Sequence, residues 1–186
     1  MRKLLTAVLP LSLCLSAPGW ALTVADVNID DTLNIQGIEM PHRGAGIRKK
    51  FFMKLYVSSL YNQDSLPAQE LMEGKSAAAI QLDIISSMIT SEKMTASMEE
   101  GFEQSAGDRL PQIQDKVDQF TAAFSEPVQE GDRFRIVSLP EKGVELRKNG
   151  KSLVAIEGET FRQVLLGIWL GDDPLDDDLK EAMLGE

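Results

Sequence analysis

Hydrophobic and polar residues alternate with a period of two in the first half of the chain, which is the pattern of β-strands. The alternation predicts strands over residues 32–40, 44–61 and 77–85. In the second of these, both faces are partly apolar, with Tyr56 on one face and Tyr61 on the other. A strand with two apolar faces is typical of the centre of a sheet that is covered on both sides.

The period then changes to that of an α-helix. Apolar residues recur every four positions from a start at Thr90 or Ser91 to a break at Gly107. Pro111 suits the first turn of a second helix, because its missing N–H has no partner there. Further helices are predicted over residues 160–169 and 174–184.

Between these helical segments the pattern returns to short strands. The sequence predicts a meander of strands over residues 132–139, 143–147 and 151–156. Asn149-Gly150 is typical of a two-residue hairpin turn. The order of strands, helices, strands and helices favours an α+β fold with a large, mostly antiparallel sheet.

The first 21 residues have the pattern of a secretory signal peptide. Arg2 and Lys3 precede an apolar stretch that ends at Leu15, and Gly19 and Ala21 are small residues at −3 and −1 of a cleavage site. The stretch is shorter than the roughly 20 residues that span a bilayer. We therefore expect a signal peptide over 1–21, a single domain over 22–186, no membrane anchor and a periplasmic location.

Composition excludes several classes of function. The net charge is −10 with scattered basic residues, which disfavours nucleic acid as a partner. The only cysteine, Cys14, lies in the signal segment, and the only histidine, His42, lies in a predicted turn. No disulfide, no metal site and no cofactor are expected. The acidic residues between 172 and 178 lack the pattern of a calcium loop and suit the start of a helix.

Three stretches resemble the chalcone isomerase-like family, in particular its bacterial exported members. They are Gly44-Ala45-Gly46-Ile47-Arg48 leading into Lys54–Tyr61, the segment Gly150–Glu157, and Phe161 followed by Ile168-Trp169-Leu170-Gly171 and Pro174. The resemblance implies an open-faced β-sandwich with helices on one side of a large antiparallel sheet. It also implies a function among plant isomerases, fatty-acid binding proteins or relatives with no known reaction.

The same resemblance argues against catalysis. The Tyr and Asn positions of the plant isomerases fall at Thr90 and Ser97, and the Thr of their entry strand falls at Tyr56. Hydroxyls at Thr90 and Ser97 do not replace a phenol and an amide in a preorganised donor set. No other nucleophile-and-base pattern occurs. We therefore expect no catalytic residues.

The fatty-acid binding relatives hold the carboxylate with an Arg and a Tyr, and the matching positions are Arg48 and Tyr56. Eight residues of uninterrupted strand would separate them by roughly 26 Å, so they meet only if the chain reverses near Phe51. Otherwise Arg48 is a surface or paired residue and Tyr56 a core aromatic. Methionines at 88, 94 and 98 line a pocket or pack in the core.

Three functions follow as hypotheses. The first is a non-catalytic periplasmic protein that binds a small hydrophobic acid such as a fatty acid, with Arg48, Tyr56, Thr90 and Ser97 as ligand-binding residues. The second is an isomerase or lyase that acts on an enone or chalcone-like substrate with a non-standard residue set. The third is a ligand-free interaction module for another envelope protein.

Overall fold

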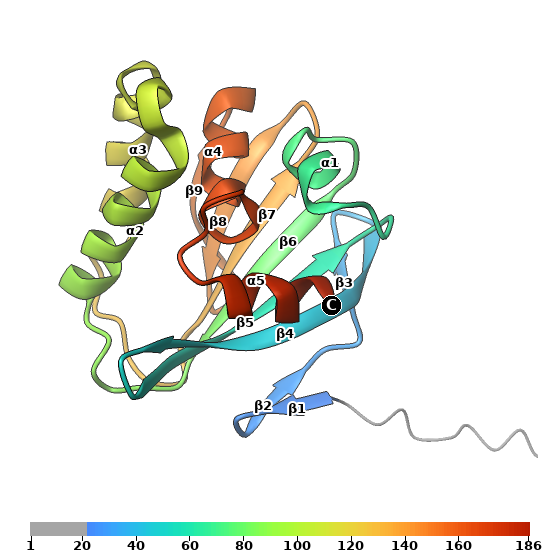
Figure 1. Cartoon of the computed structure of the whole chain (residues 1–186), viewed down its shortest axis with the longest axis vertical. Coiled ribbons are helices and arrows are strands. Elements are labelled where there is room, and N and C mark those ends of the chain that lie inside the picture. Colours follow the sequence, from blue (N-terminus) through green and yellow to red (C-terminus); the bar gives the residue numbers. More distant parts are fainter. Residues whose placement is uncertain (1–21) are drawn as a thin grey trace, which may run out of the picture.

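The computed structural model describes residues 22–186, and a curled antiparallel sheet of seven strands is its central feature (Figure 1). The strands lie side by side in the order of the chain. They are β3 (Thr32–Ile35), β4 (Ile38–Lys50), β5 (Met53–Asn62), β6 (Ala78–Ile84), β7 (Arg133–Leu139), β8 (Gly143–Lys148) and β9 (Lys151–Ile156). Short turns join most successive strands, whereas helical segments lie between β5 and β6, between β6 and β7, and after β9. The expected α+β class with a large antiparallel sheet is confirmed.

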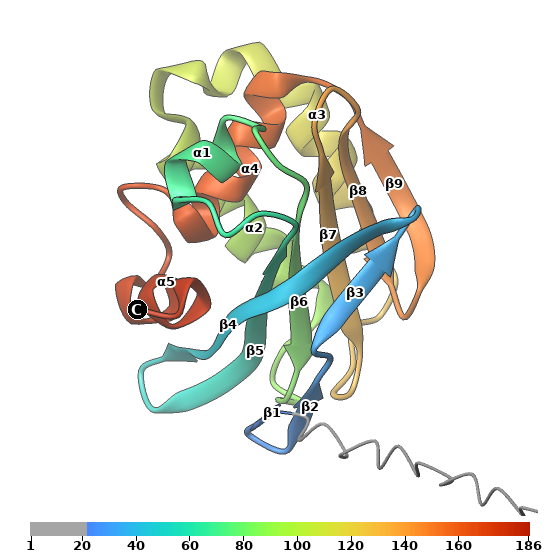
Figure 2. The same cartoon turned by 90° about the vertical axis from the view of Figure 1, so that its right-hand side faces the viewer.

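Helices cover one face of this sheet, as Figure 2 shows. They are α1 (Ala68–Met72), α2 (Ser91–Ala106), a 3-10 turn (Gly107–Arg109), α3 (Leu110–Ala122) and α4 (Glu159–Leu170). Phe102 of α2 packs against Phe120 of α3 and Phe161 of α4, with ring centroids 5.7 and 5.5 Å from its own. These rings lie in the main hydrophobic core, which joins the helices to β5–β9.

The opposite face of the sheet carries a second, smaller core. Val57, Tyr61 and Val137 belong to it, together with Met40 of the β3–β4 hairpin. A separate two-stranded ribbon of β1 (Leu22–Val24) and β2 (Val27–Ile29) contributes Ile29 to this core. Both faces of β5 are therefore covered, as its apolar pattern predicted.

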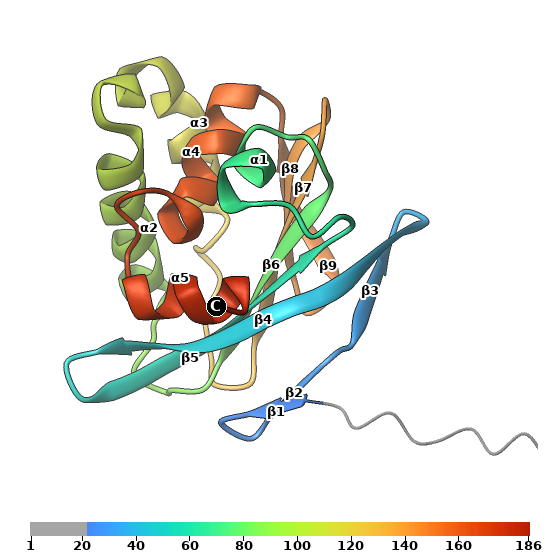
Figure 3. The same ribbon diagram turned by 45° about the vertical axis from the view of Figure 1, so that its right-hand side comes forward.

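The last helix, α5 (Asp177–Leu184), lies directly on β4 (Figure 3). A Cβ atom at Gly44 would lie 2.3 Å from the backbone oxygen of Ala182, and one at Gly46 would lie 2.9 Å from Cδ1 of Leu179. Glycine at these two positions lets a helix approach the strand more closely than any side chain permits. The Gly44-Ala45-Gly46 motif thus has a packing role.

The segment 44–61 is not one strand, and this prediction was wrong. The chain reverses at Phe51-Phe52, so β4 and β5 form an antiparallel hairpin with Lys50 opposite Met53. The turn lacks the Asn-Gly or Asp-Gly pair that usually identifies a hairpin, and the apolar run continues through it. Residues 32–40 divide in the same way into β3 and β4, with positive φ at Gln36 and Gly37.

The other predicted elements agree with the structure to within a few residues. The helix predicted from Thr90 or Ser91 is α2, and the β7–β9 meander has its Asn149-Gly150 turn with positive φ at both residues. The predicted signal peptide lies outside the described residues.

Candidate functional site

The β4–β5 hairpin brings Arg48 and Tyr56 together. Their Cα atoms are directly opposite partners in the antiparallel pair, so the reversal that their proximity required is present. Nη1 of Arg48 donates to Oδ2 of Asp176 at 2.8 Å, and the two side chains are only 15% and 17% exposed. The guanidinium charge is therefore already compensated by a carboxylate of this chain.

Tyr56 is buried and lies on the helix side of the sheet. Nε1 of Trp169 in α4 donates to the Tyr56 hydroxyl oxygen at 3.4 Å. Burial raises the pKa of the Tyr56 phenol, while the neighbouring Trp169 and Arg48 act in the opposite direction. The phenol is accordingly neutral at physiological pH and acts as a hydrogen-bonding group. Tyr61, as its position in the strand predicted, lies on the opposite face.

A pocket of about 350 Å³ opens next to Tyr56, between the hairpin, the loop after β6 and the first turns of α2. Its volume is within the range of small-molecule sites. Most of its wall is apolar, which suits a hydrocarbon chain. The lining residues are Lys50, Phe51, Met53, Leu55, Tyr56, Met88, Ile89, Lys93, Met94, Ala96, Ser97 and Glu100.

Only part of the predicted site lines this pocket. Tyr56 and Ser97 do, whereas Arg48 pairs with Asp176 and Thr90 is the N-cap of α2. The Thr90 hydroxyl accepts a hydrogen bond from the backbone N–H of Lys93 at 3.4 Å. Thr90 therefore satisfies a free donor of the helix end, as Thr commonly does at this position.

The methionines that follow β6 divide between the two roles considered for them. Met88 is 46% exposed at the pocket mouth and Met94 forms part of its wall. Met98, one helical turn further on, is completely buried and belongs to the main core. Met94 is a member of this core as well as of the pocket wall, so one helix face serves both.

Two lysines of the pocket were not identified from the sequence. Nζ of Lys50 lies 3.7 Å from Oε2 of Glu100, and both side chains are largely exposed. Nζ of Lys93 donates to the backbone oxygen of Met88 at 2.9 Å, and no carboxylate within residues 22–186 forms an ion pair with it. Lys93 therefore offers an uncompensated positive charge at an apolar pocket. Its place in the first turn of a helix gave no signal of this, because the pocket exists only after the hairpin folds back.

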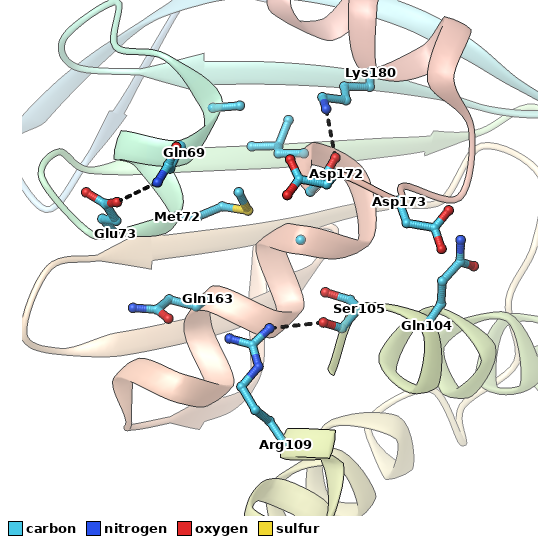
Figure 4. A pocket seen from close by; sticks show the side chains of 14 residues that line it. Gln69, Met72, Glu73, Gln104, Ser105, Arg109, Gln163, Asp172, Asp173 and Lys180 are labelled. Carbon is cyan, nitrogen blue, oxygen red and sulfur yellow. Dashed lines mark hydrogen bonds between the residues drawn. The ribbon is translucent and has the colours of Figure 1, made fainter. Parts of the chain in front are cut away.

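A second hollow, of about 490 Å³, lies between α1, α2, α4 and the segment before α5 (Figure 4). Its side chains are mostly polar, and several already have partners within the chain. Gln69 donates to Glu73 at 3.1 Å, Arg109 to the backbone oxygen of Ser105 at 3.1 Å, and Lys180 to that of Gly171 at 2.7 Å. It lacks the apolar wall that distinguishes the first pocket.

The acidic segment 172–178 contains a capping residue with two roles. Asp176 is the N-cap of α5, where its Oδ1 accepts from the Leu179 N–H at 3.1 Å, and its Oδ2 holds Arg48. Among residues 22–186, no group of three His, Cys, Asp or Glu residues is arranged to hold a metal ion. No helix of this part of the chain has the length and apolar character needed to cross a membrane.

His42 is not in a loop, contrary to the sequence interpretation. It lies in β4 beside an irregularity in the pairing with β5, and its ring packs edge-on against Tyr61 with centroids 5.3 Å apart. Burial lowers the pKa of His42, against the opposing effects of a Gly44 backbone hydrogen bond and the Asp31 carboxylate.

Comparison with known proteins agrees with this architecture. The family model described as chalcone isomerase-like matches residues 21–185. The crystal structure of AtFAP1, a fatty-acid binding protein of Arabidopsis thaliana, is similar with a TM-score of 0.72. The match covers 89% of this chain and 96% of that chain at 15% sequence identity, so it shows a common fold. A search of curated proteins found no match.

Proposed function

The chain belongs to the chalcone isomerase-like family, and we propose that it is a non-catalytic protein that binds a hydrophobic carboxylic acid such as a fatty acid. The observation that carries the proposal is the apolar pocket between the β4–β5 hairpin and α2, with an unpaired lysine at its wall. The signal-like segment 1–21 supports a periplasmic location as part of the same proposal.

In this proposal the hydrocarbon chain lies against Leu55, Met88 and Met94, which are flexible or branched apolar side chains that adapt to an irregular ligand. Tyr56 closes the inner side of the pocket as a neutral phenol, which neither repels a carboxylate nor attacks a substrate. Ser97 adds a small polar group to the wall.

The carboxylate is assigned to Lys93 rather than to Arg48. A ligand at Arg48 would compete with Asp176 for a positive charge that this part-buried carboxylate already compensates, which weakens its attraction for a second anion. Lys93 needs no such exchange, since its present partner is a neutral backbone oxygen. Arg48 then acts as a positioning residue that connects Tyr56 to α5.

The test is titration of the purified protein with a fluorescent polyene fatty acid, followed by displacement with saturated acids and with alcohols of the same length. We expect acids to bind more tightly than alcohols, and Lys93→Gln to weaken acid binding about fivefold, the upper range for an exposed ion pair. Ser97→Phe should fill the pocket and abolish binding of the fluorescent acid. Lys116→Gln is the matched control, because Lys116 is also a helical lysine whose Nζ donates to a backbone oxygen.

Absence of probe binding would contradict the proposed function. Loss of acid binding in Arg48→Met with no change in Lys93→Gln would instead move the carboxylate to the guanidinium and refute the assignment to Lys93.

A further inference from the structure

The tip of the β4–β5 hairpin exposes a large apolar surface to solvent. Phe51 is 85% exposed, Phe52 is fully exposed, and Met88 at the same pocket mouth is 46% exposed. They are three of the four large apolar side chains that are exposed within residues 22–186. Figure 1 shows this tip at the lower left, below the first turn of α2.

The turn itself does not explain these aromatic residues. Phe51 has a φ of 56°, a backbone conformation that Gly and Asn adopt readily and that a bulky residue adopts only with strain. A turn selected for folding alone would carry a small residue at this position. Two exposed phenyl rings in a strained turn therefore point to a contact outside the chain.

Positive charge surrounds the aromatic tip. Lys49, Lys50 and Lys54 flank it in the sequence with no acidic residue between them, although the chain as a whole has a net charge of −10. Lys49 and Lys54 are direct cross-strand partners, so two like-charged side chains lie on the same face of the hairpin. Like charges in this arrangement are destabilising unless an external anion compensates them. Lys93, on the other side of the pocket, adds a fourth ammonium, and Glu100 near Lys50 is the acidic residue that lines the pocket.

We propose that the hairpin tip docks on the surface of an anionic lipid bilayer, with Phe51 and Phe52 in the interface and the lysines against lipid phosphates. Exposed aromatic residues combined with lysines are the combination that holds peripheral proteins on such surfaces. The acidic remainder of the chain is repelled by the same surface and turns the tip toward it. A second copy of this chain is a poorer occupant, because it would bring the same lysines against themselves.

Docking of the tip would bring the pocket to the bilayer, an inference that rests on the proposed function. Lys50, Phe51 and Met53 belong to both the tip and the pocket wall. A tip lying in the bilayer interface therefore places the pocket mouth at the level where fatty acids reside. An acid can then pass between the bilayer and the pocket without crossing water.

Co-sedimentation with vesicles tests the docking separately from acid binding. We expect the full chain to bind phosphatidylcholine vesicles that contain phosphatidylglycerol, and to bind pure phosphatidylcholine vesicles much more weakly. Phe52→Ser should weaken binding by about tenfold or more, from the apolar surface of one ring. Lys49→Gln and Lys54→Gln should each weaken it about fivefold, and only on the anionic vesicles.

The controls keep folding and acid binding apart from docking. Phe51→Asn removes the ring and introduces a residue that adopts the positive φ of the turn readily, so this variant should fold normally. We expect it to bind anionic vesicles more weakly than the parent. Lys142→Gln changes a lysine in the β7–β8 turn at the opposite end of the sheet and should have no effect. Phe52 and Lys54 do not line the pocket, so their variants should retain binding of the polyene acid in solution.

Equal binding of parent and Phe52→Ser to anionic vesicles would overturn the proposal. So would an absence of vesicle binding, or concentration-dependent self-association that Phe52→Ser removes. A protein that binds anionic vesicles through the tip but binds no acid would retain the docking and refute the proposed function instead.

Discussion

Replacement of Asp176 by asparagine should destabilise the protein by about 2 kcal/mol, because it removes one partner of a part-buried ion pair and little else. Asp176 has two separate contacts: Oδ1 caps α5 through the Leu179 N–H, and Oδ2 holds Nη1 of Arg48. Asparagine is as good an N-cap as aspartate, so the cap survives. The change therefore isolates the charge.

The magnitude follows from the burial of the pair. Exposed ion pairs contribute about 0–1 kcal/mol, and removal of one partner from a fully buried pair costs about 3–5 kcal/mol. With side chains 15% and 17% exposed, Arg48 and Asp176 lie between these limits. Asp176→Ala loses the cap as well and should cost about 1 kcal/mol more.

The assay is equilibrium urea unfolding at neutral pH for the parent, Asp176→Asn, Arg48→Met and the double variant. Methionine keeps much of the aliphatic stem of Arg48, so packing changes little. We expect a coupling free energy of about 1–2 kcal/mol in the double-mutant cycle. A free energy of unfolding for Asp176→Asn within about 0.3 kcal/mol of the parent would show that the pair behaves as a surface contact. The argument against Arg48 as a carboxylate ligand would then fail.

Three further predictions concern other contacts. Gly46→Ala should destabilise the protein by about 1–3 kcal/mol in the same urea assay, because its Cβ would lie 2.8 Å from Cβ of Ala182. Arg162 is completely buried and donates to the backbone oxygens of Leu71 and Met72 at 3.0 and 2.6 Å, so Arg162→Met should cost about 3 kcal/mol, and an unchanged urea midpoint would contradict this. Because the pKa of His42 is lowered in the folded protein, its contribution to stability is present above its unfolded pKa of about 6.5 and is lost as pH falls through the folded value. The free energy of unfolding, measured above and below that pH, should fall less on acidification in His42→Gln than in the parent.

The sequence predicted the elements whose ends carry local signals. Helix α2 has a Thr cap and the meander has an Asn-Gly turn, and both act through backbone conformations that a short segment determines by itself. The turn at Phe51-Phe52 has no such signal, because neither residue favours the positive φ that Phe51 adopts. Helix α1 is only five residues long, which is too short for a period to be recognised.

The candidate site was less predictable than the fold, since its residues come from segments that no local pattern connects. The family resemblance singled out Arg48 and Tyr56, but it did not indicate the partner of Arg48, which is Asp176, the N-cap of α5, 128 residues away. Met94 and Met98 lie one helical turn apart and both belong to the main core, but only Met94 also lines the pocket. In the sequence, Lys93 does not differ from other surface lysines, because the pocket that it lines forms only when the β4–β5 hairpin lies beside α2.

These contacts together make the inner side of the pocket firm and its mouth adaptable. Trp169 holds the Tyr56 hydroxyl from α4, and Asp176 fixes the neighbouring Arg48 to α5, which lies on β4 without intervening side chains. The mouth, in contrast, consists of exposed Phe51 and Met88, whose rotamers are free to change. A fixed inner wall limits how deeply a ligand enters the pocket. An adaptable mouth accommodates different lengths of the ligand outside the pocket. For the proposed acid ligand, this arrangement favours recognition of one end of the molecule over recognition of its full length. Selectivity among acids should then come from the part of the ligand nearest Tyr56.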